Sequence, residues 1–381
     1  CCQVCPRSAI AMTANDEGFL YPFIDEKLCN DCGRCRRTCP VNNAIMGNTR
    51  DGASKTENDG EHIYRAYACY AKNDNVRLSS TSGGAFSQLA MKVLSNGGVV
   101  FGAGFDENFN VRHCGVEDEN GLESLRRSKY VQSHMGNTFS EAEAFLKKGR
   151  NVLFCGTPCQ IAGLKAYLKK DYNNLLTCDL ACHGVPSPMV WSMYLDYLKN
   201  RFKSNIKSVS FRDKSTGWNS SSMKIVFENG AVYMHKVKDE IFFMGFGKSI
   251  FNRMSCYNCR FRLSNSKADL TLADFWGIDR QAENGIHDNK GVSLVITHNK
   301  AGEDALFQLR EEMYIREHST EEAVKYNPRL ISSVNEPAGR KRFFADLSKG
   351  YSFDRLRRKY MDNESLKYRL KCMAKRILGR A

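Results

Sequence analysis

The most constraining feature of this chain is a cysteine run near its beginning. Cys29, Cys32, Cys35 and Cys39 are followed by Pro40, which gives the spacing C-x2-C-x2-C-x3-C-P. Three thiolates this close together bind one 4Fe-4S cube, and the fourth cysteine serves a second cube. The run therefore predicts that electrons pass through this protein.

The first residues repeat part of the same pattern. Cys1 and Cys5-Pro6 reproduce the gap and the proline that join Cys35 to Cys39. We interpret them as part of a bacterial-type ferredoxin module with two 4Fe-4S clusters, whose first two cysteines lie upstream of residue 1, so that the chain is N-terminally truncated. In such a module the fourth cysteine of each run serves the opposite cube. The predicted ligands are Cys5, Cys29, Cys32 and Cys35 for one cluster, with Cys1 and Cys39 contributing to the other.

Zinc is the alternative for this run. Zinc sites usually combine two separated C-x2-C pairs rather than four thiolates in one short run, so we favour iron. The chain has 16 cysteines among 381 residues, in ligand-like spacings. In a chain of this length such spacings indicate bound metal in a reducing compartment rather than disulfides, and we expect a cytoplasmic protein.

The net charge is +14, and many of the basic residues lie close to the end of the chain. Between Arg355 and Arg380 they are interleaved with apolar residues at roughly helical spacing. This pattern predicts a basic amphipathic helix on an anionic membrane surface or against an acidic redox partner. The alternative is a packed terminal helix with a solvated face. We expect no nucleic-acid binding, because no recognisable reading motif is present.

The rest of the chain has the pattern of an α/β protein. Beyond a polar, glycine-containing linker near 47–60, short apolar runs alternate with amphipathic helical patterns. This alternation predicts a layered α/β architecture. Asn229-Gly230 lies between two alternating segments, 223–227 and 232–237, and therefore predicts a hairpin and a mixed sheet. The hydrophobic content of 42% suffices for a sizeable core.

The predicted fold class is thus an α+β ferredoxin-like N-terminal module followed by an α/β domain with a mixed sheet and a helical basic C-terminal extension. The predicted boundaries are 1–48 for the ferredoxin module, 60–150 and 151–320 for the two parts of the α/β domain, and 321–381 for the basic tail.

Two further cysteines follow predicted strands. Apolar strands end just before Cys159 and Cys182, and each is followed by a helical pattern. The carboxyl ends of parallel strands meet at one edge of a sheet, so both thiols are expected on the same rim. A C-x2-C hook, Cys256 and Cys259, adds two more soft ligands. These four predict a further cluster; spacing alone leaves a closed zinc site open, and the neighbouring ferredoxin module favours iron.

The segment from Ser79 to Ser87 is rich in serine and glycine and precedes a helical pattern. Backbone N–H groups at a helix start can bind a phosphate. An ordinary helix cap would have the same sequence, so both interpretations stay open.

These motifs, in this order, resemble the beta subunits of hydrogenases and dehydrogenases that reduce the deazaflavin coenzyme. The resemblance spans residues 1 to about 300 and rests on the following segments: the ferredoxin module, Thr81-Ser82-Gly83-Gly84, Ser128-Lys129-Tyr130, Gly156-Thr157-Pro158-Cys159-Gln160, Cys182-His183-Gly184-Val185-Pro186-Ser187, Cys256-x2-Cys259, Ala268-Asp269 and Asp274-Phe275-Trp276-Gly277.

The resemblance implies a flavin, FAD, bound beside an iron-sulfur cluster. It assigns the further cluster to Cys159, Cys182, Cys256 and Cys259, with Cys155 and Cys178 nearby as competitors. It implies that His183 tunes the cluster or delivers a proton near neutral pH, although a structural histidine is the alternative. The flavin-lining residues that it implies are Thr81, Ser82, Gly83, Gly84, Ser128, Lys129, Tyr130 and Thr157, with Asp274 and Trp276 closing the site.

Two functions follow as expectations. The first is an oxidoreductase that relays electrons from the ferredoxin-type clusters through the further cluster to a flavin, which reduces a small organic or deazaflavin-like substrate. Its partner is an electron donor or acceptor protein. The second is an electron-transfer subunit or adaptor without a substrate of its own, which docks on a separate catalytic protein. A ferredoxin module joined to a zinc-stabilised binding domain is a third alternative.

Overall fold

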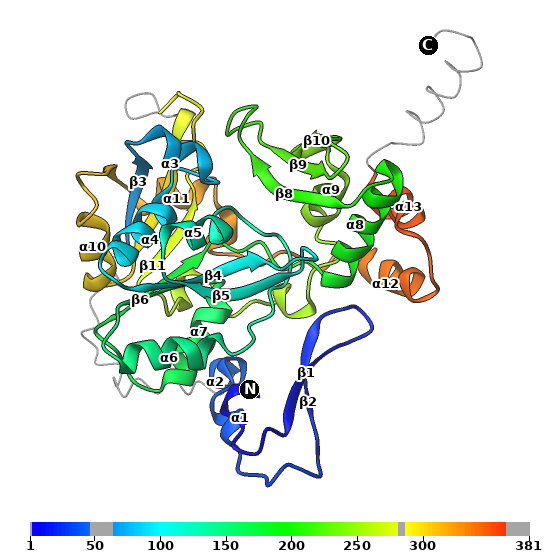
Figure 1. Cartoon of the computed structure of the whole chain (residues 1–381), viewed down its shortest axis with the longest axis horizontal. Helices are drawn as coiled ribbons and strands as arrows, with labels where there is room; N and C mark the ends of the chain where they lie inside the picture. Colours follow the sequence, from blue (N-terminus) through cyan, green and yellow to red (C-terminus); the bar gives the residue numbers. More distant parts are fainter. Residues whose placement is uncertain (1, 46–63, 281–285, 363–381) are drawn as a thin grey trace.

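A computed structural model of the chain describes residues 2–45, 64–280 and 286–362 (Figure 1). Cys1, the whole predicted linker and the basic tail beyond residue 362 lie outside the described residues. Among the helices of the described part, none is long and apolar enough to cross a membrane.

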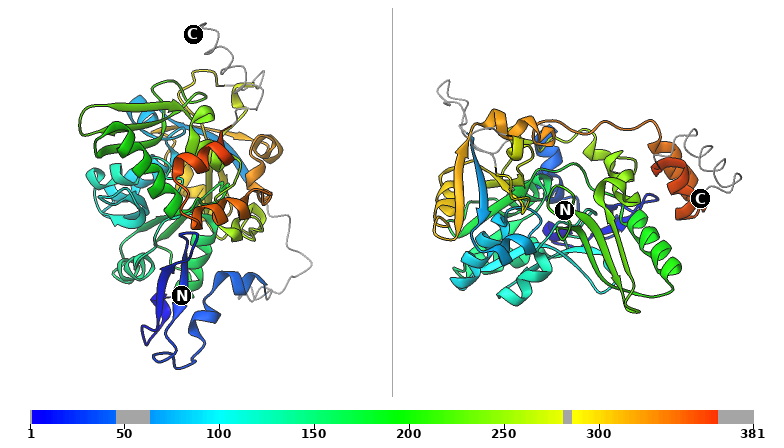
Figure 2. Two further views of the ribbon diagram at one scale, coloured as in Figure 1. Left: turned by 90° about the vertical axis from the view of Figure 1, so that its right-hand side faces the viewer. Right: turned by 90° about the horizontal axis from the view of Figure 1, so that it is seen from above.

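The N-terminal module consists of a two-stranded hairpin and two short helices. Strands β1 (Ile10–Ala14) and β2 (Leu20–Ile24) pair antiparallel, with Ile10 opposite Ile24. Helices α1 (Arg34–Arg37) and α2 (Pro40–Ile45) follow. The module lies at one end of the molecule, and its hairpin extends toward the helices near the C-terminus (Figures 1 and 2). The resulting arrangement gives the module two separate contacts with the rest of the chain.

An eight-stranded mixed sheet forms the centre of the remaining chain. The four strands in its middle run parallel to one another, and the strands added at both sides are antiparallel to their neighbours. In sheet order the strands are β13 (Met313–His318), β3 (Arg65–Ala71), β12 (Ser293–Thr297), β11 (Leu270–Asp274), β7 (Leu175–Leu180), β6 (Val152–Cys155), β4 (Val99–Phe105) and β5 (Val111–Val116).

Helices cover both faces of this sheet because its central strands are apolar on both sides. On one face, Val100 and Leu153 pack with α4 (Ala85–Ser95), α5 (Glu119–Leu125) and α10 (Lys300–Phe307). On the other, Val99 and Phe154 pack with α6 (Thr138–Lys147) and α7 (Pro158–Leu168), and Ala66 packs with α11 (Thr320–Lys325). Helix α3 (Asp74–Ser79) packs near the end of β3. This is the layered α/β architecture that the sequence predicts.

A second part of the molecule contains a smaller antiparallel sheet, with β10 (Val232–Lys236), β9 (Ser222–Phe227) and β8 (Ile206–Asp213) side by side. The predicted hairpin around Asn229-Gly230 is confirmed as β9–β10. It does not belong to the large sheet, whose mixed character comes from its own outer strands. An alternating pattern identifies a strand but not the sheet that the strand joins, and this explains the difference.

The helices of this second part enclose an aromatic core together with the small sheet. They are α8 (Pro188–Phe202), α9 (Ile241–Gly247), α12 (Arg340–Ser348) and α13 (Phe353–Leu356). Phe242, Phe343 and Leu356 are fully buried there. Up to residue 362, the predicted basic extension is therefore packed into a core rather than laid out as a free surface helix.

Candidate functional site

The N-terminal module contains a hollow lined by cysteines. The four thiols predicted for one cluster, Cys5, Cys29, Cys32 and Cys35, all line it, beside the apolar side chains of Ile10 and Ile24. The hollow has about 340 Å³ of empty space, part of it open to solvent. The set of four thiolates around an open volume matches the donors that a 4Fe-4S cube requires. The structure thus brings together the four residues that sequence spacing had selected.

Cys39 lies away from this hollow, just before α2. Its N–H donates to the carbonyl of Arg36 at 3.3 Å, and Pro40 begins the helix. Helix α2 packs against α7, which carries Cys159 in its first turn. The Cys39 end of the module therefore faces the α/β domain, whereas its predicted companion Cys1 lies outside the described residues.

A second group of thiols forms where three distant segments meet. Cys159 is in the first turn of α7, Cys182 follows β7, and Cys256 ends the 3-10 helix Met254–Cys256. Burial raises the pKa of Cys182, and the neighbouring thiols of Cys256, Cys159 and Cys259 raise it further. Such mutual effects require the four sulfurs to lie near one another. The predicted ligands of the further cluster are thus gathered at one place.

The first two of these cysteines meet because their strands are parallel neighbours. Strands β6 and β7 pair with Cys155 opposite Cys178, so the residues that follow both strands emerge at the same edge. Thr157 caps α7 through a capping box with Gln160, and its Oγ1 lies 3.2 Å from the Sγ of Cys159. Cys155 and Cys178 themselves are buried inside the sheet, so the competing thiols do not reach this edge.

The C-x2-C hook is brought to this edge by pairing between two loops. Pro186 and Asn252 form a β-bridge, and the N–H of Arg253 donates to the carbonyl of Val185 at 3.0 Å. Gly184 allows the close approach. A Cβ on this residue would lie 2.7 Å from Asn252 Nδ2 and 3.3 Å from the Cβ of Cys256. The glycine of the Cys182-His183-Gly184 motif is therefore needed so that the hook can pack against Cys182.

A single zinc ion is the alternative occupant of these four thiols. A tetrahedral zinc site holds its sulfurs roughly 4 Å apart, given Zn–S bonds of about 2.3 Å. Throughout residues 2–45, 64–280 and 286–362, no three Cys, His, Asp or Glu side chains are arranged to hold one ion. Four neighbouring thiols also supply the ligands that an iron-sulfur cube requires.

Arginines surround the second thiol group. Arg262 is buried and donates from Nη1 to the carbonyl oxygens of Cys182, at 2.5 Å, and Arg329, at 2.7 Å. Burial raises the pKa of Cys256 to about 11 and also raises that of Cys159, and the positive charge of Arg253 opposes both shifts. Positive charge beside several thiolates lowers the cost of keeping them ionised in a poorly solvated place.

His183 lies beside this group in a packed position. Its Nε2 is 2.9 Å from the hydroxyl of Ser249, and its ring contacts the edge of Phe246 with the centroids 4.7 Å apart. Burial lowers the pKa of His183 to about 4. These contacts favour a neutral, structural histidine, and the predicted catalytic role of His183 stays a prediction.

The segments predicted to line a flavin do meet. Thr81 Oγ1 accepts a hydrogen bond from the N–H of Ser128 at 2.9 Å, which joins the loop before α4 to the loop after α5. Ser82 and Gly83 are used in packing instead. Ser82 donates to the carbonyl of Val292 at 2.7 Å, and a Cβ on Gly83 would lie 2.2 Å from the carbonyl oxygen of Cys69. Gly84 caps α4 at φ +97°.

Asp274 organises a buried polar cluster rather than an open site. It accepts from Arg212 Nη1 at 2.7 Å and from Trp218 Nε1 at 2.8 Å. The indole of Trp218 stacks on that of Trp276 with centroids 4.8 Å apart. Thr157 contacts Cys159 instead, with its Oγ1 3.2 Å from the sulfur.

Basic residues that the sequence analysis did not select converge near Thr81. Lys214 Nζ donates to the carbonyls of Ser82, Arg77 and Lys290 at 2.6 to 2.7 Å. Arg127 donates to the carbonyl of Ser79 at 3.1 Å. Together with Arg212 they form a cationic lining that suits an anionic, phosphate-bearing group. Interior charges of this kind have no periodic pattern in a sequence, so local patterns do not select them.

Lys129 and Tyr130 complete the predicted flavin set. Lys129 Nζ donates to the carbonyls of Ser124 and Arg126, at 2.8 and 2.6 Å, and burial lowers its pKa to about 7. Tyr130 packs edge-on against Phe211 and Phe243. An amine that is half protonated near neutral pH can change charge when an anion binds beside it.

The low pKa of Lys129 predicts a pH-dependent stability. Its folded pKa of about 7 lies below the unfolded value near 10.4, so the unfolded chain binds more protons between these pH values. The free energy of unfolding should therefore rise with pH across this window, by up to roughly 1.4 kcal/mol per pH unit from this residue. In Lys129→Met this part of the rise should vanish. Urea unfolding from pH 7 to 10 measures it, with the exposed Lys148→Met as control; parallel profiles for all three proteins would contradict it.

The described fold and its two thiol groups are those of an electron-transfer oxidoreductase with a mixed α/β domain. Residues 149–323 match the family model for the C-terminal part of the beta subunit of coenzyme F420 hydrogenase/dehydrogenase. This match confirms the resemblance to the beta-subunit family that was drawn from the sequence motifs.

Among solved structures, the chain is similar to a component of the F420-reducing NiFe hydrogenase complex from Methanosarcina barkeri, studied as a xenon derivative. The two are 15% identical, and the match covers 77% of this chain and 90% of the other with a TM-score of 0.46. Values of this size do not by themselves establish a common activity. No curated protein matches the chain.

Proposed function

We propose that the protein is an iron-sulfur flavoprotein oxidoreductase that relays electrons from ferredoxin-type clusters through a further 4Fe-4S cluster to a flavin, FAD, which reduces a small organic or deazaflavin-like substrate. The proposal rests above all on one observation. Cys159, Cys182 and the Cys256/Cys259 hook come from separate segments, and yet they lie close enough for neighbouring thiols of this set to raise the pKa of Cys159, Cys182 and Cys256.

The position of the module supports the proposed order of the sites. Cys39 lies directly before α2, and α2 packs against the helix that begins beside Cys159. The hollow lined by Cys5, Cys29, Cys32 and Cys35 lies in the same module. In this proposal an electron donor or acceptor protein docks at the module, and the substrate binds at the α/β domain.

The residues proposed to hold each group have the required chemistry. Thiolates are the ligands of 4Fe-4S cubes, which supply one-electron transfer when bound. For the flavin, the hydroxyls of Thr81 and Ser128 and the nearby Arg127 supply hydrogen-bonding groups for phosphates, and Lys214 adds positive charge. A flavin exchanges electrons singly or in pairs, which is the property that a link between clusters and an organic substrate requires.

The adaptor alternative is favoured by a different observation. Ser82, Gly83 and Asp274, all predicted to line the flavin, are occupied by internal contacts. A chain that holds clusters but no flavin would pass electrons to a separate catalytic protein and have no substrate of its own. The two functions therefore differ in flavin content.

Anaerobic purification with iron, sulfide and flavin analysis separates the two. The relay requires about eight or more iron atoms per chain, from at least two four-iron cubes, together with bound flavin. After rapid mixing with a reductant that reaches the clusters, the visible absorbance of the clusters should bleach before that of the flavin. Clusters without flavin would select the adaptor, and about four iron atoms per chain would overturn both, because the second thiol group would then be empty.

A further inference from the structure

The hairpin of the N-terminal module is inserted into the second part of the molecule. Phe19, in the turn between β1 and β2, is fully buried in the aromatic core and contacts Phe344 with ring centroids 6.5 Å apart. Gly18 has φ +80°, and a Cβ there would lie 2.3 Å from the Cβ of Met189 in α8. No residue larger than glycine has room at position 18, so the turn fits closely against α8.

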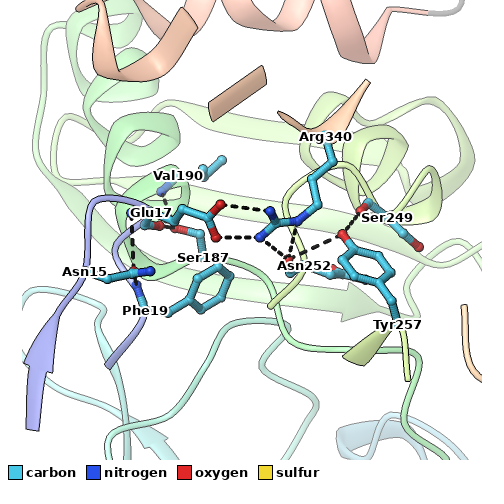
Figure 3. Close-up of polar contacts among 9 residues, drawn as sticks. All are labelled: Asn15, Glu17, Phe19, Ser187, Val190, Ser249, Asn252, Tyr257 and Arg340. Carbon is cyan, nitrogen blue, oxygen red and sulfur yellow. Dashed lines mark hydrogen bonds and ion pairs between the residues drawn. The ribbon is translucent and has the colours of Figure 1, made fainter. Parts of the chain in front are cut away.

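A buried ion pair fixes the same turn. Arg340 Nη1 and Nη2 donate to the carboxylate of Glu17 at 2.8 and 2.5 Å, and only 3% of the Arg340 side chain is exposed (Figure 3). Ser187 Oγ, at the start of α8, donates to the carbonyl of Glu17 at 2.5 Å. Two-point hydrogen bonding to a carboxylate defines orientation as well as distance.

Arg340 also holds the loop that carries the cysteine hook. Its Nε and Nη2 donate to the carbonyl of Asn252 at 3.1 and 3.0 Å. The hydroxyl of Tyr257 donates to the carbonyls of Ser249, at 2.5 Å, and Asn252, at 3.3 Å (Figure 3). One guanidinium therefore connects Glu17 of the module to the segment on either side of Cys256.

Arg253 makes a second connection to the hairpin. Its Nη1 donates to the carbonyl of Leu20 at 2.9 Å, and its guanidinium lies 3.9 Å from the centre of the Tyr21 ring. At its other end, the carbonyl of Arg253 accepts the N–H of Cys256 at 2.9 Å. The side chain of Arg253 therefore contacts strand β2, while its backbone begins the turn that contains Cys256.

This loop has little regular structure of its own. Between α9 and β11 the described chain contains only two short 3-10 helices, Met254–Cys256 and Leu263–Asn265. Both polar side-chain atoms of Asn252 are buried without a hydrogen-bond partner, which disfavours the observed conformation. Contacts from outside the loop must therefore hold it, and a cluster requires its ligands placed within about half an ångström.

We propose that Arg253 and Arg340 are positioning residues through which the docked β1–β2 hairpin holds Cys256 and Cys259 in place for the further cluster. The ferredoxin module then has two roles, since it supplies electrons and also shapes the next site in the relay. The inference rests on the proposed function for the cluster itself, but the mechanical connection between hairpin and loop exists without it.

Glu17→Gln tests the connection, and Asp16→Asn, an exposed neighbour in the same turn, is the matched control. Hydrogen exchange of the purified protein should show at least tenfold faster exchange across residues 249–259 in Glu17→Gln than in the wild type, since the clamp is loosened. Gly18→Ala should do the same by displacing the turn. Unchanged exchange in both variants would overturn the inference, as would equal acceleration in Asp16→Asn.

The cluster gives a second readout that a merely structural contact would not move. Arg253→Gln removes a positive charge beside Cys159 and Cys256, and should make the cluster about tenfold harder to reduce at a fixed potential, a shift of about 59 mV for one electron. Arg253→Lys keeps the charge and should restore most of this shift in a potentiometric titration followed by electron paramagnetic resonance. An identical potential in all three proteins would overturn the positioning role. A wild type without this resonance would overturn the proposed function instead, while the exchange experiment would still test the hairpin.

Discussion

In the proposed relay, Cys256→Ser should lose the further cluster and keep those of the ferredoxin module. The iron content is expected to fall by about four atoms per chain, because a serine hydroxyl does not replace a thiolate as a cluster ligand. Cys256 approaches Cys182 through the pairing of two loops, and Cys259, the other thiol on that segment, is already a ligand in the proposed cluster. Reduction of the flavin through the clusters should fall by at least a hundredfold. Iron analysis and stopped-flow absorbance measure both effects.

The matched control for this variant is Cys178→Ala. Cys178 lies on β7, four residues before Cys182, but it is fully buried against Cys155 inside the sheet. Its replacement should leave iron content and electron transfer unchanged. If Cys256→Ser keeps all its iron and its flavin is still reduced at the wild-type rate, the group of four thiols is not a cluster site and the relay has no link between module and flavin.

The cysteine positions show why part of this site could be predicted from sequence. Cys159 and Cys182 each follow a buried strand and precede a helix, and the rule that parallel strands present their carboxyl ends at one edge suffices to place them together. The cysteine spacings in the module are local, so their convergence around one hollow needed no knowledge of the remaining fold.

The hook required information that local patterns do not contain. Cys256 reaches Cys182 because Pro186 pairs with Asn252, and because Arg340 and the hairpin hold the loop. These partners lie far apart in the sequence. For the same reason the docking of the hairpin was not predicted, since Glu17 and Arg340 are each unremarkable charged residues in a polar segment. Only the fold makes them a buried pair.

The residues predicted to line a flavin show a different limit of prediction from sequence. The family resemblance selected Ser82, Gly83 and Asp274, and the structure uses all three for packing or ion pairing. The basic residues beside them, Arg212 and Lys214, were not selected, because a charged residue is ordinarily expected at the surface. Burial lowers the pKa of Lys214 to about 7, whereas three carbonyl partners hold its position.

Asp274→Asn should destabilise the protein by about 3–5 kcal/mol, because it removes one partner of a buried ion pair. Arg212 and Asp274 have only 8% and 12% of their side chains exposed. Burial alone would lower the pKa of Arg212, but the carboxylate of Asp274 raises it overall, so the arginine depends on this partner for its charge. Urea unfolding followed by tryptophan fluorescence measures the loss, and the stacked Trp218 and Trp276 provide a local signal.

The variant Glu123→Gln is the matched control, since it breaks the pair with Arg126 at a carboxylate that is 58% exposed. A loss within roughly 1 kcal/mol is expected there. The double variant Arg212→Met/Asp274→Leu should recover much of the stability lost in Asp274→Asn, because no unpaired charge remains in the interior. If the double variant recovers stability but binds no flavin, Arg212 contributes to flavin binding as well as to the stability of the fold. If Asp274→Asn costs no more than Glu123→Gln, the pair is solvated in solution and Arg212 is not held by Asp274.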